Sequence, residues 1–274
     1  MRNAIHMLKS VTNVQMNSFA ITTTDGHVVF VDGGFDQDAE YLLEYLREIT
    51  GSAVPHVDAW ILTHPHIDHI SAFLTIVEKH PDAIEFDRIL YNFPSVQFVS
   101  SEPRDSSEPL MRFYRDLPKF AEKIVICSGG DQYDFGLAHF DILCSPDCAL
   151  NMNVGNNACL VFKLSLGKKT ALFLADCGEE EGDKLLSMWD SNTLSADICQ
   201  MAHHGQAGVK RDFYEIVRPK TCIWCAPDWL WNNDAGKGYN THTFKTLITR
   251  AWMDELGAAD HVVLKDGTQV VSMD

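Results

Sequence analysis

The chain has 274 residues, 46% of them hydrophobic and 10% aromatic, and its 38 acidic and 22 basic side chains give a net charge of −16. This composition is that of a globular protein, and the length allows a sizeable core without disulfides. The negative charge repels phosphate backbones and anionic membranes, so it disfavours nucleic-acid and membrane partners. Bound metal cations reverse the local field inside a cleft, so the net charge disfavours nucleic-acid binding without excluding it.

The sequence contains no sign of export or of a membrane span. Its apolar runs are much shorter than the roughly 20 residues that cross a bilayer. Residues 1–10 lack the apolar core of a signal peptide. The eight cysteines lie mostly inside apolar runs, which is typical of reduced, buried thiols in a protein that is not exported. We therefore predict a cytoplasmic protein.

In chain order, short apolar runs alternate with segments of helical periodicity. Residues 28–31 are predicted to form a strand that ends in the turn Asp32-Gly33-Gly34, since glycine tolerates such turns most easily. A helix is predicted from Asp36 or Asp38 to Ile49. The same patterns predict strands over 57–62, 89–91, 140–144, 158–164, 170–174, 198–202, 221–225 and 261–264, and helices over 70–79, 110–121, 179–188 and 243–256.

Strands that alternate with helices indicate the α/β class. No low-complexity linker or short repeat divides the chain, so residues 1–274 are predicted to form one domain with two β-rich halves. Residues 92–104 are irregular and contain several Ser and Pro. Together with the predicted helix that follows, the segment 92–121 is the expected insertion or lid.

Four polar side chains follow the predicted strand 57–62 within six residues: His64, His66, Asp68 and His69. Imidazole nitrogens and carboxylate oxygens are ligands that zinc accepts, and strand ends are where open α/β folds place their sites. Side chains two apart share a face, so His64 and His66 are expected to reach one ion and Asp68 and His69 a second. The alternative is a polar cluster with Asp68 capping the helix, but each buried member would then need its own partner.

This His-x-His-x-Asp-His string, within residues 59–69, resembles the signature of the metallo-β-lactamase superfamily. Residues 28–34 resemble the family's early strand and Asp-Gly turn, and 171–176 resemble the strand whose terminal Asp bridges two metals. Residues 201–205 resemble the His-His-Gly motif of one branch, which includes the hydrolase domain of bacterial DNA-uptake proteins and the phosphorylcholine esterases. The resemblance runs from about residue 13 to 271.

The resemblance implies a four-layer αββα sandwich that holds two metal ions, with zinc expected and Mn²⁺ or Fe as alternatives. His64 and His66 resemble ligands of the first metal. The second metal takes Asp68, His69 and one residue of the His203/His204 pair, with Asp176 between the two ions. We favour His204 as the ligand and His203 as its neighbour in the substrate pocket.

One departure from the family pattern concerns the first metal, to which the family usually supplies a further histidine. Near the expected place this chain offers Asn156, Asn157, Asp147 or Cys148 instead. The third protein ligand of the first metal, and with it the number of ions, therefore stays open.

The implied function is that of a metal-dependent hydrolase that uses a metal-bound hydroxide, most simply on a small phosphoester or phosphodiester. Asp68 is expected to orient the water or hold the second ion, and His203 or His242 to stabilise charge on the substrate. The alternatives are a hydrolase of a lactam, lactone or thioester, and a non-catalytic metal-binding module on the same scaffold. The oligomeric state is not predicted.

Other polar and aromatic candidates have two interpretations each. Cys222 and Cys225 are three apart on a predicted strand, so they point to opposite faces and favour packing over metal binding. Asp32 either caps its glycine turn or orients a ligand histidine from behind. Trp229 and Trp231 either wall a substrate pocket or cover the edge of the core.

Overall fold

The structure, a computed structural model, describes residues 1–102, 106–147, 149–150 and 153–274. Its first sheet has the strand order β14-β1-β2-β3-β4-β5-β6. Strands β14 to β3 pair antiparallel with their neighbours, and β3 to β6 pair parallel. The strands are β1 (Ala4–Met7), β2 (Ser18–Thr22), β3 (Val28–Asp32), β4 (His56–Leu62), β5 (Glu85–Tyr91), β6 (Ile124–Ile126) and β14 (Gln269–Ser272).

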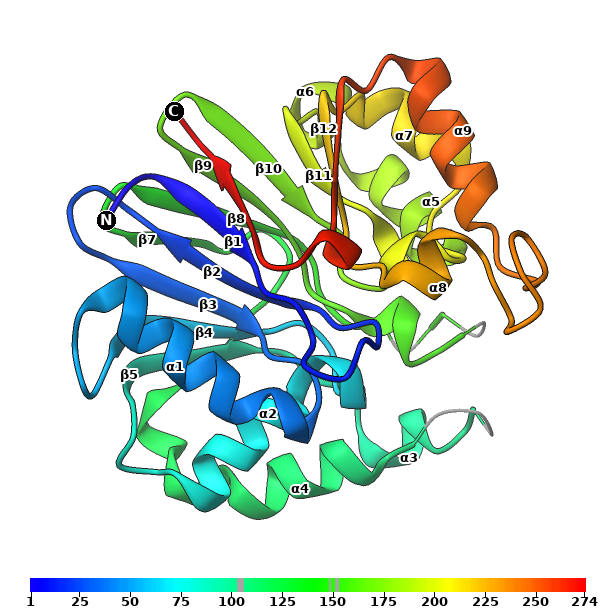
Figure 1. Cartoon of the computed structure of the whole chain (residues 1–274). Helices are drawn as coiled ribbons and strands as arrows, with labels where there is room; N and C mark the ends of the chain where they lie inside the picture. The colour runs from blue at the N-terminus through cyan, green and yellow to red at the C-terminus, as the bar shows by residue number, and fades with distance from the viewer. Residues whose placement is uncertain (103–105, 148, 151–152) are drawn as a thin grey trace.

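The second sheet repeats this plan, with the order β13-β12-β11-β10-β9-β8-β7. Strands β7 to β10 pair antiparallel and β10 to β13 pair parallel. The strands are β7 (Gln132–Phe135), β8 (Ala138–Cys144), β9 (Val161–Leu166), β10 (Lys169–Phe173), β11 (Ile198–Gln200), β12 (Thr221–Trp224) and β13 (Asp260–Val263). After β13 the chain crosses back, and β14 pairs with β1, so both ends of the chain belong to the first sheet (Figure 1).

Helices cover the outer face of each sheet, which gives the predicted αββα sandwich (Figure 1). The first sheet is covered by α1 (Ala39–Thr50), α2 (Ile67–Lys79) and α4 (Glu108–Asp116), and the second by α5 (Glu179–Met188), α7 (Arg211–Val217) and α9 (Thr246–Leu256). Three short helices lie in connections: α3 (Val96–Val99), α6 (Ser191–Leu194) and α8 (Asp228–Trp231).

The strands are apolar on both faces because each sheet lies between two cores. In β3, Val29 and Val31 point between the sheets, while Val28 and Phe30 point toward the helices. This alternation follows from the two-residue period of a strand. Burying each such side chain contributes about 1.5–3 kcal/mol. Because both faces of the central strands are buried, these strands have continuous apolar runs in the sequence rather than alternating apolar and polar residues.

Several predicted boundaries differ from the structure: the strand predicted over 89–91 begins at Glu85, the strand predicted over 198–202 ends at Gln200 and the helix predicted over 243–256 begins at Thr246. Two further boundaries were wrong for local reasons. The helix predicted over 110–121 ends at Asp116, because Pro118 follows in a separate 3₁₀ turn. The strand predicted from residue 158 begins at Val161, because Asn156–Ala158 form a 3₁₀ turn.

The predicted lid segment, 92–121, includes residues 103–105, which lie outside the described residues. Its helix α4 packs Leu110 and Phe113 into the core between the first sheet and its helices. The single domain and the lid role of this segment both stay predictions. Within the described part of the chain, no helix has the length and apolar character to traverse a lipid bilayer, and the cytoplasmic location also stays a prediction.

Candidate metal centre

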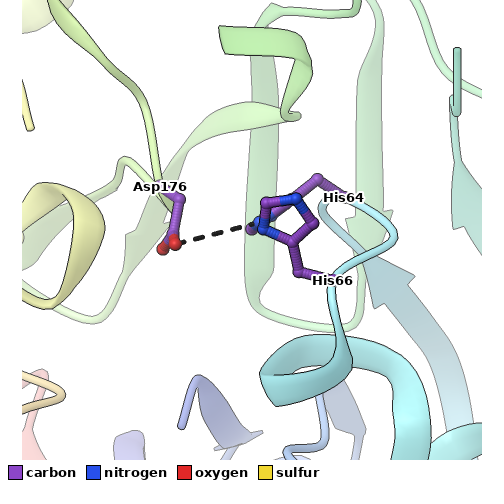
Figure 2. A group of neighbouring side chains, drawn as sticks. All are labelled: His64, His66 and Asp176. Atoms are coloured by element: carbon purple, nitrogen blue, oxygen red, sulfur yellow. Dashed lines mark ion pairs between the residues drawn. The ribbon is translucent and has the colours of Figure 1, made fainter. Parts of the chain in front are cut away.

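The histidine-rich loop lies where β4 ends and α2 begins. Strands β3, β4 and β5 run parallel, so their carboxyl ends share one edge of the sheet, the usual place for a site. The chain turns from β4 into α2, whose first turn carries Asp68 and His69. His64 and His69 are fully buried and Asp68 is 8% exposed. Figure 2 shows the imidazoles of His64 and His66, from the loop ahead of α2, facing the carboxylate of Asp176.

The second sheet supplies its polar groups from two separate strand ends. Asp176 follows β10, and His203 and His204 follow β11. The backbone is unusual at both places: φ is 45° at Ala175, 50° at His203 and 54° at His204. Left-handed conformations of residues other than glycine cost on the order of 1–3 kcal/mol each and cluster at functional sites. The backbone is therefore strained at the positions that orient these side chains.

The six residues predicted as metal ligands meet in two neighbouring groups. One contains His64, His66 and Asp176, and the other Asp68, His69 and His204; within each group the candidate ligand atoms lie within 4.8 Å of one another. Asp176 links the groups: Oδ2 lies 3.9 Å from Nε2 of His64 and 3.4 Å from Nε2 of His204, and Oδ1 lies 3.2 Å from Nε2 of His69. Their role as ligands stays a prediction.

The polar atoms that face the centre fit a metal pair. Nε2 of His64, His69 and His204 and Oδ1 of Asp176 are buried and have no hydrogen-bond partner among the described residues. A buried polar atom without a partner costs about 1–3 kcal/mol, which metal coordination would offset. Nitrogen and carboxylate donors suit zinc, and iron and manganese accept the same donor types. The donor set therefore fits divalent ions without selecting one.

The protonation of the histidines in the centre, which is set by burial and by the nearby carboxylates, also fits metal binding. Burial, followed by the nearby His69 and His66, holds the pKa of His64 well below its usual value, so its ring is neutral. At His69, burial is outweighed by Asp176 and Asp32, which raise its pKa to about 10. The pKa of His204 is likewise raised despite burial, chiefly by Asp176. In the metal-free protein these protons balance the carboxylates, and metal binding would displace them.

Asp32 orients His69 from outside the centre. Its Oδ2 accepts a hydrogen bond from Nδ1 of His69 at 2.7 Å, which leaves Nε2 aimed at Asp176. Thr63 and Asn17 hold the same carboxylate at 2.7 and 2.8 Å. Such partners fix the tautomer and the orientation of a ligand ring. The hydrogen bond expected from the orienting interpretation of Asp32 is present, and the role of His69 as a ligand stays a prediction. Asn17 carried no signal in the sequence, whereas Thr63 directly precedes the motif.

The two neighbouring histidines differ in burial. His204 is fully buried, and its Nε2 lies 3.1 Å from Oδ2 of Asp68. The side chain of His203 is 19% exposed, its Nε2 lies 3.7 Å from Oδ2 of Asp176, and Nδ2 of Asn156 lies 3.4 Å from the same nitrogen. His204 therefore lies within the second candidate group and His203 at its border, and the choice of His204 as the ligand stays a prediction.

The candidates for the third protein ligand of the first metal differ in where they lie and in which partners they contact. Asn156 lies beside the centre, and its buried Oδ1 has no hydrogen-bond partner in the described structure. Asn157 points elsewhere, because its Oδ1 accepts the backbone N–H of Glu181. Asp147 pairs with Lys184 at 3.0 Å. The fourth candidate, Cys148, lies outside the described residues.

His242 lies in an aromatic cluster rather than in either ligand group. Its ring stacks on Phe244 with centroids 3.8 Å apart and lies 6.1 Å from Trp229. Nδ1 accepts the backbone N–H of Thr243 at 2.9 Å, so a neutral ring carries its proton on Nε2. The backbone N–H of Lys245 donates to Gln206 at 2.7 Å, which joins this segment to the His203–His204 turn.

The remaining candidate residues, Trp231, Cys222 and Cys225, pack in the core or at its edge. Trp231 lies between Trp224, 5.5 Å away by ring centroid, and the guanidinium of Arg250, 3.6 Å from its ring, so it covers the core edge. Cys222 points into the core beneath the outer helices and Cys225 into the core between the sheets, as expected for residues on opposite strand faces.

A third His/Asp group lies at the other end of β4. It contains His56, Asp58 and Asp87 and is largely exposed. Both oxygens of Asp58 already accept hydrogen bonds, from Nδ1 of His27 at 2.7 Å and from the backbone N–H of Val28 at 2.8 Å. These contacts order the start of the strand, and we assign this group no metal.

Comparison with known proteins agrees with this architecture. A family model described as the metallo-beta-lactamase superfamily matches residues 11–110. ComE operon protein 3 of Bacillus subtilis (strain 168) is 26% identical over 178 residues, which are 64% of this chain and 20% of that protein. The chain thus spans about a fifth of the length of this relative.

Two solved structures share the fold across nearly the whole chain. The metallo-beta-lactamase fold protein YhfI from Bacillus subtilis is 12% identical with a TM-score of 0.58, over 99% of this chain and 100% of YhfI. CmlA, a diiron beta-hydroxylase from Streptomyces venezuelae, is 12% identical with a TM-score of 0.58, over 98% of this chain and 54% of CmlA. The family-model match over residues 11–110, the relative from Bacillus subtilis and the shared fold support the assignment of the chain to the metallo-β-lactamase superfamily.

Proposed function

We propose that this protein is a metal-dependent hydrolase of a small anionic phosphodiester or phosphomonoester. The proposal depends chiefly on one observation, the convergence of six His and Asp side chains in two neighbouring groups. In four of them, His64, His69, His204 and Asp176, a buried ligand atom has no hydrogen-bond partner among the described residues. The His203-His204-Gly205 turn, which resembles a branch that includes phosphorylcholine esterases, supports the phosphoester class. Two bound divalent ions, zinc in our proposal, would lower the pKa of a water molecule and polarise the scissile group.

Asp68 is the residue we assign to the attacking water. It lies in the first turn of α2, where its Oδ2 is 3.1 Å from Nε2 of His204 and 3.4 Å from Nε2 of Gln15. Although burial opposes ionisation, His204 and His69 hold the pKa of Asp68 below its usual value, so it is a carboxylate at neutral pH. A carboxylate here accepts a hydrogen bond from the water and fixes its direction of attack.

His203 and His242 are the residues we assign to the substrate. The partly exposed ring of His203 borders Asp176, so it is placed to hydrogen-bond a phosphoryl oxygen. His242 presents an Nε2–H and is held by its stack on Phe244. We assign it to the leaving-group oxygen. The net charge of −16 favours a small anion over a polyanion, because the acidic surface repels a long anionic chain outside the site.

A chromogenic panel tests the reaction class. The zinc- or manganese-loaded protein is assayed with bis(p-nitrophenyl) phosphate, p-nitrophenyl phosphate, p-nitrophenyl acetate, nitrocefin, a lactone and a thioester. We expect the phosphodiester or phosphomonoester to be hydrolysed best. A lactone, lactam or thioester as the best substrate would overturn the substrate class. No turnover with two bound ions would leave the non-catalytic metal-binding module as the function.

The variant Asp68→Asn tests the assigned role within the same panel. We expect activity to fall at least about 100-fold, or roughly 2.7 kcal/mol of transition-state stabilisation, with the fold retained. Asp87→Asn, at the exposed third group, is the matched control and should keep full activity. Full turnover by Asp68→Asn would contradict its role. Anomalous scattering at the metal absorption edges identifies the ions.

A further inference from the structure

A buried carboxyl group and a buried thiol lie beside the turn that carries Asp176. Glu181, in the first turn of α5, and Cys159, just before β9, are both fully buried. Sγ of Cys159 donates to Oε2 of Glu181 at 3.0 Å, while Oε1 has no hydrogen-bond partner among the described residues. Burying a carboxyl with incomplete hydrogen bonding is costly, and nothing in the mechanism above uses it.

The thiol also contacts the Asp176 turn directly. Sγ of Cys159 lies 3.5 Å from the carbonyl oxygen of Leu174, and the same oxygen accepts the backbone N–H of Cys177 at 2.9 Å. This second hydrogen bond closes the turn that contains Ala175, whose φ is 45°, and Asp176. The thiol therefore lies between the carboxyl of Glu181 and the strained turn.

A second contact joins the same two segments. Oδ1 of Asn157 accepts the backbone N–H of Glu181 at 3.2 Å, so an amide from another part of the chain satisfies the N-terminus of α5. A Cβ on Gly178 would lie only 2.5 Å from that oxygen, so glycine alone fits this approach. Segment 156–159, which also places Asn156 beside His203, is thus fixed to segment 174–181 at two points.

We propose that Glu181, Cys159 and Asn157 form a buried clamp that holds the strained Asp176 turn in the geometry required for metal binding. They act as positioning residues and do not touch the metals. A strained conformation persists only when its surroundings over-determine it, and ligand atoms must be fixed before the ion arrives if affinity is to be high. The inference depends on the metal centre of the proposed function and is independent of the substrate class.

Zinc affinity of the full-length protein, measured by competition with a chromophoric chelator, tests the clamp. Cys159→Ala is expected to bind zinc about 10- to 100-fold more weakly, the range typical of lost outer-sphere support. Cys222→Ala is the matched control: Cys222 is equally buried, on β12, and its thiol points into the core beneath the outer helices. We expect its zinc affinity to stay within about twofold of wild type.

Urea unfolding of the metal-free variants separates positioning from general loss of packing. Both cysteine variants should lose similar stability, and only Cys159→Ala should lose zinc affinity. Wild-type zinc affinity in Cys159→Ala, or an equal loss of zinc affinity in Cys222→Ala, would overturn the clamp. Glu181→Leu provides a second route and should weaken zinc binding at least as much as Cys159→Ala.

The outcome also distinguishes this inference from the proposed function. Wild-type protein that binds zinc tightly but hydrolyses no phosphoester would refute the substrate class and leave the clamp supported by the affinity data. Wild-type protein that binds no divalent metal would overturn both.

Discussion

The two sheets of the sandwich follow the same strand plan but supply the metal centre differently. Each has a run of antiparallel pairs followed by a run of parallel pairs, and in each the polar groups follow parallel strands. The first sheet delivers its groups from one loop and helix start, residues 64–69. The second delivers Asp176 from the end of β10 and the His203–His204 pair from the end of β11.

The backbone conformations of the two sets of polar residues also differ. No residue from 64 to 69 has a positive φ, because a strand that leads into a helix already directs successive side chains to one place. In the second sheet Ala175, His203 and His204 all have positive φ. In the second sheet the strained residues thus include the candidate ligand His204 and the neighbours of the candidate ligands. In the first sheet the strain lies outside the cluster, at Asp32 with φ 53°, which orients His69.

The largest effect is expected from the second sheet's shared residue. Asp176→Asn removes the carboxylate that lies between the two candidate groups, so both ions of the proposed pair would lose a ligand. We expect activity to fall at least about a thousandfold, or roughly 4 kcal/mol, and metal content to fall to one ion or fewer. Elemental analysis and the phosphoester assay measure both. A variant that retained two ions would show that the groups do not share Asp176.

The next prediction concerns the hydrogen bond by which Asp32 orients His69 in the first half of the chain. Asp32→Asn weakens the hydrogen bond that fixes His69, and metal affinity should fall by about 10- to 100-fold. Asp58→Asn is the control, because Asp58 also holds a histidine, His27, and a backbone N–H, but at the opposite end of β4. Equal losses of zinc affinity in the two variants would refute a specific role for Asp32.

The same contrast explains how much the sequence predicts. The group at 64–69 is contiguous, so its spacing alone indicates a metal site. The α/β class follows from the alternation of strands and helices, whereas the αββα arrangement is implied only by the family resemblance. The contacts of Asn17 and Glu181 depend on pairings between distant segments, and neither residue carries a local pattern. Strand β1, only four residues long and including His6, likewise lacks a recognisable period.

A smaller effect is expected for the pH dependence of stability, to which one buried titratable group in each half of the molecule contributes: His6 in strand β1 and Glu181 in helix α5. His6 in β1 bonds Tyr45 and Thr22, and burial, with a lesser contribution from Arg2, lowers its pKa from 6.5 to about 4. Burial raises the pKa of Glu181 from 4.5 to about 7. Between pH 5 and 6.5 the unfolded chain binds more protons at residue 6 and the folded chain more at residue 181. Stability therefore rises with pH through His6 and falls through Glu181.

Urea unfolding of the metal-free protein at pH 5 and 6.5 separates these two slopes. His6→Gln should lower the gain in unfolding free energy between pH 5 and 6.5 by about 2 kcal/mol, and Glu181→Gln should increase it by a similar amount. Shifts of the same sign in both variants would contradict the burial of one of these groups in its uncharged form.

The smallest effect concerns helix ends, where the two halves again differ. Helix α1 ends at Gly51 with φ 69°, whereas α7 ends at Arg218 with φ 47°, and in each the cap N–H closes the last turn. A left-handed residue with a side chain costs about 1–2 kcal/mol, partly offset in the comparison by the greater freedom of glycine in the unfolded chain. Arg218 is exposed, and its Nε bonds the carbonyl oxygen of Glu215.

Arg218→Gly should therefore raise the unfolding free energy by about 0.5 kcal/mol, and Gly51→Ala should lower it by about 1 kcal/mol. Both are measured by urea unfolding of the zinc-loaded protein, and neither should change zinc affinity. A loss of stability in Arg218→Gly would mean that the Arg218–Glu215 hydrogen bond outweighs the backbone strain. In that case strain in the second half would be compensated locally at the helix end, as we infer it is at the Asp176 turn.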